Sequence, residues 1–379
     1  MTKQKSVFKT IVVVLLLLFF VSAFFSIFRD RKQTVAGTVN EQVENASGAF
    51  YLKLNGENEL SVSEEERTLL GGKKAEAITI DGGTINVTGA ELGVIEAANA
   101  GTLTFKNTTI KDKTENKQSA AYNNYIRFGG KLRFENCTIE SVYLKNDAQA
   151  EFVNCTFIST VPRWYSAWVA DGSALFENCK FTGYRGIKIN EFKNEDVLNV
   201  SINGCTFENI SEKVGIAIGK FLTEPLNGVI SVKKNRFIDC QQWDAIGSIE
   251  GVDGIYEADT YTSELEFIQE ENVVEYTGTT RKIQYVMYKI GEGKGYQEIP
   301  KVFWDSNGNY PTTYEVGKET EIDYLYQFAD YGGLGDSEFV DWYLDRECTK
   351  VFNGKITSDM NEPITLYAKI LVNCWTGWH

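Results

Sequence analysis

An eight-residue pattern of apolar and polar positions recurs along the middle of the chain. Its first and third residues are apolar and flank a mostly polar one, which is the alternation of a β-strand with one buried face. Its eighth residue is always Ile or Phe, so a second inward-facing strand follows at once. Seven octets align without gaps: ITIDGGTI (78–85), LTFKNTTI (103–110), LRFENCTI (132–139), AEFVNCTF (150–157), ALFENCKF (174–181), VSINGCTF (200–207) and ISVKKNRF (230–237).

The fifth position of the octet predicts a corner between these two strands. Six of the seven octets carry Asn or Gly there, and the seventh carries Lys234. Asn and Gly tolerate left-handed backbone angles, and one residue in that conformation bends the chain and shifts the alternation by one. Both flanking strands then face the same core. The six residues are Gly82, Asn107, Asn136, Asn154, Asn178 and Gly204.

Such a coil cannot bury its own apolar face, so copies must stack above and below it. The third positions of successive octets lie 25, 29, 18, 24, 26 and 30 residues apart, which indicates loops of different length between similar coils. Over about residues 75–275 the octets resemble those of the right-handed parallel β-helix family, the pectin-lyase-like fold of secreted bacterial proteins. The resemblance implies a mostly β chain in which residues 75–298 form a solenoid of about seven to eight coils.

Four cysteines occupy the sixth position of successive octets. We expect an inward ladder of free thiols acting as small apolar residues, because side chains stacked in register point alongside one another. The chain has seven cysteines, an odd number that does not suit a complete disulfide framework. Disulfides are the alternative, and no metal site is predicted. The four are Cys137, Cys155, Cys179 and Cys205.

Both ends of a solenoid need a cover. Residues 33–74 are the expected N-terminal cap, in which the capping box Ser63-Glu64-Glu65-Glu66 begins a short helix. Leu69 and Leu70 give this helix its apolar residues, and Gly71-Gly72 ends it. At the other end, the strand-like runs YTSELEFIQ and KIQYVMYKI within residues 255–298 predict the last coil and an exit strand.

From about Lys301 the repeat stops. Residues 301–370 carry VFWDSNGNYPTTYEVGK, FVDWYLDRECTKVFNGKIT and ITLYAKI, and resemble the Listeria–Bacteroides repeat, or internalin B-type repeat, a small β-grasp-like module of bacterial surface proteins. We expect Trp342 and Tyr343 to lie in its core. The strand ITLYAKI would bury Ile364, Leu366 and Ala368, or its opposite face. Residues 371–379 form a tail that fits neither unit.

Residues 1–32 are a targeting segment. Three lysines precede the apolar run 11–28, and the charged letters RDRK follow it. The segment is either a signal peptide, cut after Ala23, or an uncleaved membrane anchor, since eighteen apolar residues are just long enough to span a bilayer. Either alternative places the rest of the chain outside the cytoplasm.

Composition removes several classes of function. The 38 basic and 52 acidic residues give a net charge of −14, which opposes binding to the phosphates of a nucleic acid. The single histidine is His379, the last residue, so histidine-based catalytic triads and His-rich metal sites are excluded. No cofactor is expected.

Two groups of residues are candidates for a functional site. The loop PRWYSAW could bind sugars, because aromatic rings stack on sugar rings and arginine donates to hydroxyls or carboxylates; alternatively its tryptophans cover the solenoid. Acidic and basic residues on neighbouring coils could supply a lyase-like site; alternatively they are solvated surface charges. The binding candidates are Arg163, Trp164, Tyr165, Trp168 and Trp243. The catalytic candidates are Asp171, Glu177, Arg185 and Lys188.

These features predict an exported protein of the cell envelope or cell surface, secreted or tethered to the bacterial membrane through residues 11–28. Its expected work is non-catalytic: adhesion to, or binding of, a polysaccharide or a host or cell-surface protein. A polysaccharide lyase or glycoside hydrolase acting on an acidic polysaccharide is one alternative. A purely structural envelope spacer is another.

Overall fold

The computed structural model describes the greater part of the chain from Thr38 onward. The predicted targeting segment, with the apolar run 11–28, lies outside this part. Within it, nothing helical has the length and hydrophobicity that a membrane crossing requires. The described residues are 38–62, 67–71, 74–88, 94–98, 101–113, 126–144, 149–161, 165–169, 172–189, 198–210, 215–218, 228–240, 246–248, 265–291, 301–302, 311, 313–322, 337–345 and 347–372.

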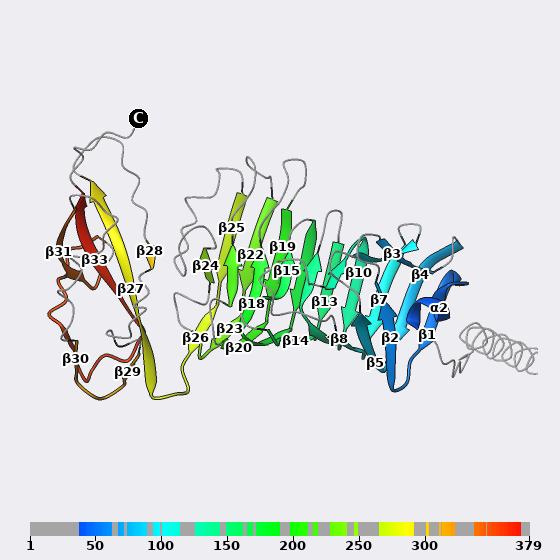
Figure 1. Cartoon of the computed structure of the whole chain (residues 1–379), viewed down its shortest axis with the longest axis horizontal. Coiled ribbons are helices and arrows are strands. Elements are labelled where there is room, and N and C mark those ends of the chain that lie inside the picture. The colour runs from blue at the N-terminus through cyan, green and yellow to red at the C-terminus, as the bar shows by residue number, and fades with distance from the viewer. Residues whose placement is uncertain are drawn as a thin grey trace, which may run out of the picture.

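Residues 47–238 form a β-solenoid, so the predicted parallel β-helix is confirmed. Each coil adds one strand to each of three parallel sheets, which we call sheets A, B and C (Figure 1). Sheet A has nine strands, in the order β1 (Ser47–Lys53), β4 (Lys74–Asp81), β7 (Thr102–Lys106), β10 (Lys131–Glu135), β13 (Gln149–Val153), β16 (Ser173–Glu177), β19 (Leu198–Asn203), β22 (Gly228–Lys233) and β25 (Leu265–Glu270).

Sheets B and C continue each coil. Sheet B has nine strands: β2 (Glu57–Ser61), β5 (Thr84–Thr88), β8 (Thr109–Asp112), β11 (Thr138–Glu140), β14 (Thr156–Ser159), β17 (Lys180–Gly183), β20 (Thr206–Ile210), β23 (Arg236–Ile238) and β26 (Val273–Glu275). Sheet C has eight: β3 (Arg67–Leu70), β6 (Val94–Ala97), β9 (Ile126–Phe128), β12 (Val142–Leu144), β15 (Tyr165–Val169), β18 (Arg185–Ile189), β21 (Ile216–Ile218) and β24 (Ile246–Ser248).

The octets set the register of sheets A and B. Their third positions pair across sheet A, so phenylalanine rings stack inside the solenoid; the centroids of Phe134 and Phe152 are 4.9 Å apart, and those of Phe152 and Phe176 are 4.8 Å apart. A second stack forms below sheet B from the eighth positions, where Phe181 and Phe207 lie 4.7 Å apart. All these rings are fully buried. Offset stacking and burial together make them the main apolar core.

The corner prediction is also confirmed. All four predicted asparagines and both glycines have positive φ angles, and so does Lys234, at 56°. The asparagine side chains form a ladder along the corner, in which Asn154 donates to Asn136 (3.3 Å) and Asn136 donates to Asn107 (3.4 Å). The geometry of the coil therefore imposes the left-handed conformation even on a lysine.

The cysteines at position six are buried, free and part of the core. Three of them, Cys137, Cys179 and Cys205, also donate hydrogen bonds to the preceding coil; the Cys137 thiol donates to the carbonyl of Phe105 (3.4 Å). Asn235 holds the same octet position and donates to the carbonyl of Ile202 (2.9 Å). The neighbouring Cys155 thiol and burial raise the pKa of Cys137, which keeps it in the thiol form. Position six is therefore a small buried donor, and not simply an apolar residue.

The two ends of the solenoid are closed differently. At the N-terminal end, the short helix α2 (Val39–Val43) buries Val39 and Val43 against the core and contacts β2. The Asn40 amide donates to the carbonyl of Ser61 and accepts from its N–H, both at 3.0 Å, so it replaces a neighbouring strand there. At the C-terminal end, Val232 of β22 pairs with Gln269 of β25, which is exposed. The inward position of this last coil is therefore polar, so this end of the solenoid needs less shielding from water.

The solenoid begins one coil earlier than predicted, and the prediction of a helix at Leu69 and Leu70 was wrong. The strands β1, β2 and β3 belong to the three sheets, so a coil precedes residue 75, where a cap was expected. Leu69 and Leu70 lie in β3 and not in a helix, because alternate burial against the core outweighs the local capping signal. Ser63 to Glu66 lie outside the described residues. The predicted last coil is present as β25 and β26.

The C-terminal unit is a curled mixed sheet with its own core. Its central strands are β27 (Thr280–Gly291) and β33 (Ile364–Val372), which pair in parallel, while β31 (Ser337–Tyr343) pairs antiparallel with β33. The run KIQYVMYKI was expected at the end of the solenoid, but it lies in β27. Its alternation identified a strand, and alternation alone does not identify the partner strand.

The core of this sheet agrees with the sequence. Trp342 is 1% exposed and meets Tyr285 edge to face, with centroids 5.5 Å apart. Tyr343 is also buried, as are the three predicted residues of β33. The remaining strands are β28 (Lys301–Val302) and β29 (Thr313–Glu315), which pair with β27, and the pair β30 (Thr320–Glu321) and β32 (Lys355–Ile356). Residues 373–379 of the predicted tail lie outside the described part.

A buried carboxylate ties the first coils together and makes the fold sensitive to acid. Asp81 is 8% exposed and accepts hydrogen bonds from Tyr51, Asn107 (2.8 Å) and Lys53 (2.9 Å). Burial raises the pKa of Asp81, but these three hydrogen bonds and the Lys53 charge outweigh it, so the pKa lies below its ordinary value. The stabilisation is therefore complete above the unfolded-state pKa of about 3.9 and is lost as the pH falls through the lower folded-state pKa.

We expect Asp81→Asn to lower the free energy of unfolding by about 1–3 kcal/mol at pH 7, the range for hydrogen bonds to a charged group. The loss should shrink as the pH falls from about 5 to about 2, because wild type loses the same stabilisation there. Urea unfolding followed by circular dichroism at several pH values measures this. Glu140→Gln, on the outer face of sheet B, is the control and should keep the wild-type pH dependence. An Asp81→Asn deficit that is constant with pH would contradict the assignment.

Candidate functional site

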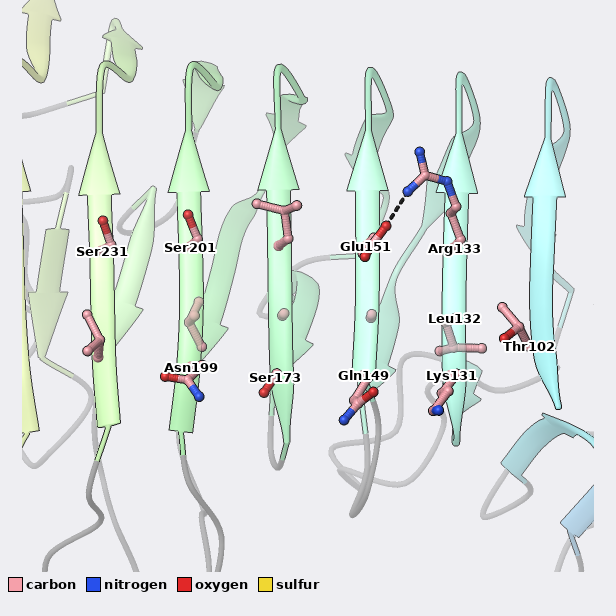
Figure 2. A pocket seen from close by; sticks show the side chains of 15 residues that line it. Thr102, Lys131, Leu132, Arg133, Gln149, Glu151, Ser173, Asn199, Ser201 and Ser231 are labelled. Carbon is pink, nitrogen blue, oxygen red and sulfur yellow. Dashed lines mark hydrogen bonds and ion pairs between the residues drawn. The ribbon is translucent and has the colours of Figure 1, made fainter. Parts of the chain in front are cut away.

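The outer face of sheet A carries a groove of about 530 Å³. It crosses the six strands from β7 to β22, and its floor consists of two rows of outward side chains that pair in register (Figure 2). The first row is Thr102, Lys131, Gln149, Ser173, Asn199 and Val229. The second row is Arg133, Glu151, Leu175, Ser201 and Ser231.

Six of these eleven side chains carry a hydroxyl or an amide: Thr102, Gln149, Ser173, Asn199, Ser201 and Ser231. The inward positions between them hold the buried core, so the sheet presents a regular floor on which outward residues of neighbouring strands stand about 4.8 Å apart. Leu175 and Val229 add half-exposed apolar surface among the polar groups. A floor with spaced donors, acceptors and apolar patches suits an extended ligand rich in hydroxyl groups.

The charges of the groove gather at its β10 end. Arg133 forms an ion pair with Glu151, and a longer one of 3.5 Å with Glu135. Lys131 is exposed, and among the described residues it has no ion-pair partner. Lys106 lowers the pKa of Glu135 through a hydrogen bond, and burial opposes it; the two groups are 2.7 Å apart. Among the described residues, the β10 end of the groove therefore has one cation without an ion-pair partner, Lys131, while Arg133 and Glu151 pair with each other.

Four of the predicted site residues meet on sheet C, on the neighbouring strands β15 and β18. The Lys188 Nζ lies 3.5 Å from the centroid of the Trp168 ring, and the Arg185 guanidinium carbon lies 5.3 Å from that of Tyr165. Trp168 and Lys188 pair in register, and so do Tyr165 and Arg185. Binding and catalytic candidates that the sequence analysis treated separately thus form two cation–π pairs.

These pairs are not an open sugar platform. Tyr165 and Trp168 are each 5% exposed, and Lys188 is 8% exposed. The Ser166 hydroxyl is also buried and donates to the carbonyl of Arg185 (2.9 Å). A desolvated cation over an aromatic face stabilises by about 2 kcal/mol, so the arrangement joins two coils. Trp168 is therefore a buried residue of strand β15.

The remaining candidates do not join this cluster. Glu177 lies on β16 of sheet A, between Val153 and Asn203, and so in a different sheet from Arg185 and Lys188. Asp171, Arg163, Trp164 and Trp243 lie outside the described residues. In the parts of the chain that are described, no group of three or more His, Cys, Asp or Glu side chains is placed to hold a metal ion.

Sequence reasoning missed the groove, although the octets contain its signal. The second position of each octet and the residue before the first position both point outward from sheet A. From Ser173 onward these two positions carry no charge: four of the six residues are Ser173, Asn199, Ser201 and Ser231, and the other two are Leu175 and Val229. The sequence-based prediction used only the inward positions of the octets and the aromatic loop, and did not use these outward positions.

Comparison with known proteins identifies no relative: no family model, no curated protein and no solved structure matches the chain.

Proposed function

We propose that this protein is a non-catalytic polysaccharide-binding protein of the bacterial cell envelope, which holds an extended glycan along the groove of sheet A. The observation that carries the proposal is the floor of that groove, with its hydroxyl and amide groups in register on successive strands. A polymer lying across the strands would meet at least one hydroxyl or amide group on each of the four strands from β13 to β22. A repeating ligand and a repeating surface match in this way without any one strong contact.

The contacts available in the groove fit sugars. Ser173, Asn199 and Ser201 can donate to and accept from hydroxyl groups. Leu175 and Val229 can lie against the apolar face of a sugar ring. Lys131 adds a charge that would favour an acidic unit at one end. Binding of this kind is the sum of modest contacts, so we expect affinity to rise with the length of the glycan.

Two observations favour binding over catalysis. The basic candidates Arg185 and Lys188 hold aromatic rings on sheet C. The acidic candidate Glu177 lies on sheet A. A polysaccharide lyase or glycoside hydrolase needs its acid, base and charge-stabilising groups around one bond, and these three residues are split between two sheets. Such an enzyme remains the alternative function.

The finer assignments belong to the same proposal. We take the solenoid as a right-handed, pectin-lyase-like helix of seven to eight coils. We take the C-terminal sheet as a Listeria–Bacteroides-type module with a β-grasp-like fold. Residues 11–28 would export the chain and either tether it or be removed.

The test is binding of the full chain to a panel of neutral and acidic plant, animal and bacterial-wall polysaccharides, with release of reducing ends measured in the same samples. We expect binding without release, and at least tenfold weaker binding for Ser201→Trp, because the indole would fill the groove floor. Thr206→Trp is the matched control: it lies outward on the next strand of the same coil, β20, but in sheet B. It should bind as wild type does.

Each other outcome has a definite meaning. Binding that survives Ser201→Trp but is lost in Thr206→Trp would move the site to sheet B. Release of reducing ends that Ser201→Trp abolishes would make the protein an enzyme of this groove. No binding to any polysaccharide would reject the proposal and leave a protein partner or a structural spacer.

A further inference from the structure

The first row of the groove carries opposite charges near its two ends. Lys131 of β10 is exposed, and the four positions that follow it in register, on β13 to β22, are uncharged. On β25, the next strand beyond the groove, the same position holds Glu266, which is also exposed and pairs with Val229. The row therefore has a positive and a negative end, with an uncharged stretch of four strands between them.

These two charges are not neutralised by their surroundings. No ion pair of the described residues includes Lys131 or Glu266. By contrast, Glu270 on the same strand as Glu266 pairs with Lys233 at 3.0 Å. Five strand spacings of about 4.8 Å put Lys131 and Glu266 about 24 Å apart. Salt screens exposed charges beyond about 8–10 Å, so these two side chains do not neutralise each other, and each can act on a different part of a long ligand.

The row between the two charges is straight. The strands from β10 to β25 pair in parallel without a register shift. Each coil advances the row by about 4.8 Å, which is close to the length of one sugar unit in an extended glycan. A glycan with equatorial linkages, such as a β-1,4-linked glucan, is a straight ribbon and can keep one unit over each coil. An α-1,4-linked glucan curves into a helix and would leave the row after a few units.

The other residues of the floor limit how acidic the ligand can be. Glu151 of β13 is exposed, although it pairs with Arg133. A glycan with a carboxylate on every unit would set like charges beside Glu151 and Glu266, and most of its carboxylates would meet no cation. Hydroxyl and amide groups such as those of Ser173 and Asn199 suit neutral sugar units instead. The floor therefore favours a mostly neutral glycan with one acidic unit at the β10 end.

We infer that the groove holds a straight, mostly neutral glycan with equatorial linkages, with one sugar unit over each coil and an acidic unit over Lys131. The inference rests on the proposed glycan binding and adds the class of glycan and its placement. The carboxylate of the acidic unit accepts a hydrogen bond from the Lys131 ammonium group, and four neutral units lie over β13 to β22. The sixth unit lies beside Glu266, where a second carboxylate is repelled.

The experiment measures the affinity of the full chain for four six-unit oligosaccharides by calorimetry at low salt. Three are β-1,4-linked glucans: one neutral, one with a glucuronate at one end, and one with a glucuronate at each end. The fourth is a neutral α-1,4-linked glucan. We expect one glucuronate to tighten binding about two- to fivefold, the effect of an exposed ion pair, and the second glucuronate to remove that gain. The α-linked oligomer should bind about fivefold more weakly than the neutral β-linked one, because only part of it can contact the row.

Two charge variants test the placement, and each is judged by a ratio of affinities for two oligomers, so that a general change in binding cancels. Lys131→Gln should abolish the preference for the singly acidic oligomer over the neutral one. Glu266→Lys should make the doubly acidic oligomer bind more tightly than the singly acidic one. Lys74→Gln is the matched control, because Lys74 is exposed on β4 of the same sheet but outside the groove, and it should keep both ratios.

The outcomes separate this inference from the proposed function. Oligomers that bind with ratios unchanged in Lys131→Gln and Glu266→Lys would overturn the placement of the charges. Equal binding of the α-linked and β-linked oligomers would overturn the straight ligand. A polysaccharide that binds while none of the six-unit oligomers does would overturn the arrangement of one unit per coil. In these three cases glycan binding itself would stand, whereas a chain that binds neither polymer nor oligomer would reject both proposals.

Discussion

Phe152→Ala is expected to lower the free energy of unfolding by about 3–5 kcal/mol, the range for removing a large buried aromatic side chain. Phe152 is fully buried in the middle of its stack, between Phe134 at 4.9 Å and Phe176 at 4.8 Å. It also meets Phe157 edge to face at 5.2 Å. Strands β10 and β16 hold the two stacking partners in place, so their rings cannot move into the cavity left by Phe152. Little of the lost unfolding free energy is therefore recovered by relaxation.

The measurement is urea unfolding followed by circular dichroism. Phe267→Ala is the matched control, because Phe267 is an inward phenylalanine of sheet A at the last coil, where it is only half-buried. Its loss should be less than half as large, since the surroundings can relax and part of the ring already meets water. In a solenoid each coil depends on its neighbours, so the central variant should also lose cooperativity. Equal losses for both variants would show that the stack is not the main support.

The repeat could be predicted because burial and backbone geometry act on the same octet. Inward positions such as Phe152 and Phe176 must be apolar, and the corner residue Asn154 must accept a positive φ angle. The octet alignment did not detect the first coil, because the corner between β1 and β2 is one residue longer than the other corners. Leu52 pairs with Ile80 and Glu57 with Thr84, so five positions in β1–β2 match four in β4–β5. A gapless alignment cannot detect a coil with such an insertion.

Sheet C could not be predicted from the octets, for a different physical reason. All five residues of β15 are buried, so the period-two pattern that marks a half-buried strand is absent. Trp168 and Tyr165 therefore resembled an aromatic loop, the usual form of a sugar platform. Only the register of β15 with β18 brings Lys188 and Arg185 over their rings. Contacts between coils depend on loop lengths, and the sequence of one coil does not reveal them.

The groove could be predicted in part from the sequence, less fully than the repeat and more fully than sheet C. Its residues occupy octet positions that are outward by the same alternation that identified the core, so its location follows from the repeat. Its ligand does not follow, because serine and asparagine side chains such as Ser201 and Asn199 are also ordinary residues of a solvated sheet face. What distinguishes them is their alignment on successive strands, which requires the register.

Gly186→Ala is expected to be about as destabilising as the loss of a large core side chain, although it adds only one methyl group. A Cβ at Gly186 would lie 1.9 Å from the carbonyl oxygen of Gly215 on the next coil. That oxygen accepts a hydrogen bond from the N–H of Ile187 (2.8 Å), so backbone, and not a flexible side chain, would have to move. Overpacking typically costs about 1–3 kcal/mol. Weakening the buried hydrogen bond adds about 1–3 kcal/mol.

We expect Gly186→Ala to lower the free energy of unfolding by about 2–6 kcal/mol, the sum of those two ranges. Gly278→Ala is the matched control, since a Cβ at Gly278 meets nothing within 4 Å and its φ angle is not in the left-handed region. It should be neutral or stabilising by up to about 1 kcal/mol, because alanine restricts the unfolded chain.

The same substitution also tests whether the cation–π cluster depends on the close approach of the coils. Moving β18 away from Gly215 would shift Arg185 from Tyr165 and Lys188 from Trp168. The Trp168 ring would then gain exposure, so quenching of tryptophan fluorescence by acrylamide should increase before global unfolding. A stable variant with unchanged quenching would contradict the packing of β15, β18 and β21. A stability loss with unchanged quenching would confine the strain to the backbone at Gly215 and leave the cluster independent of it.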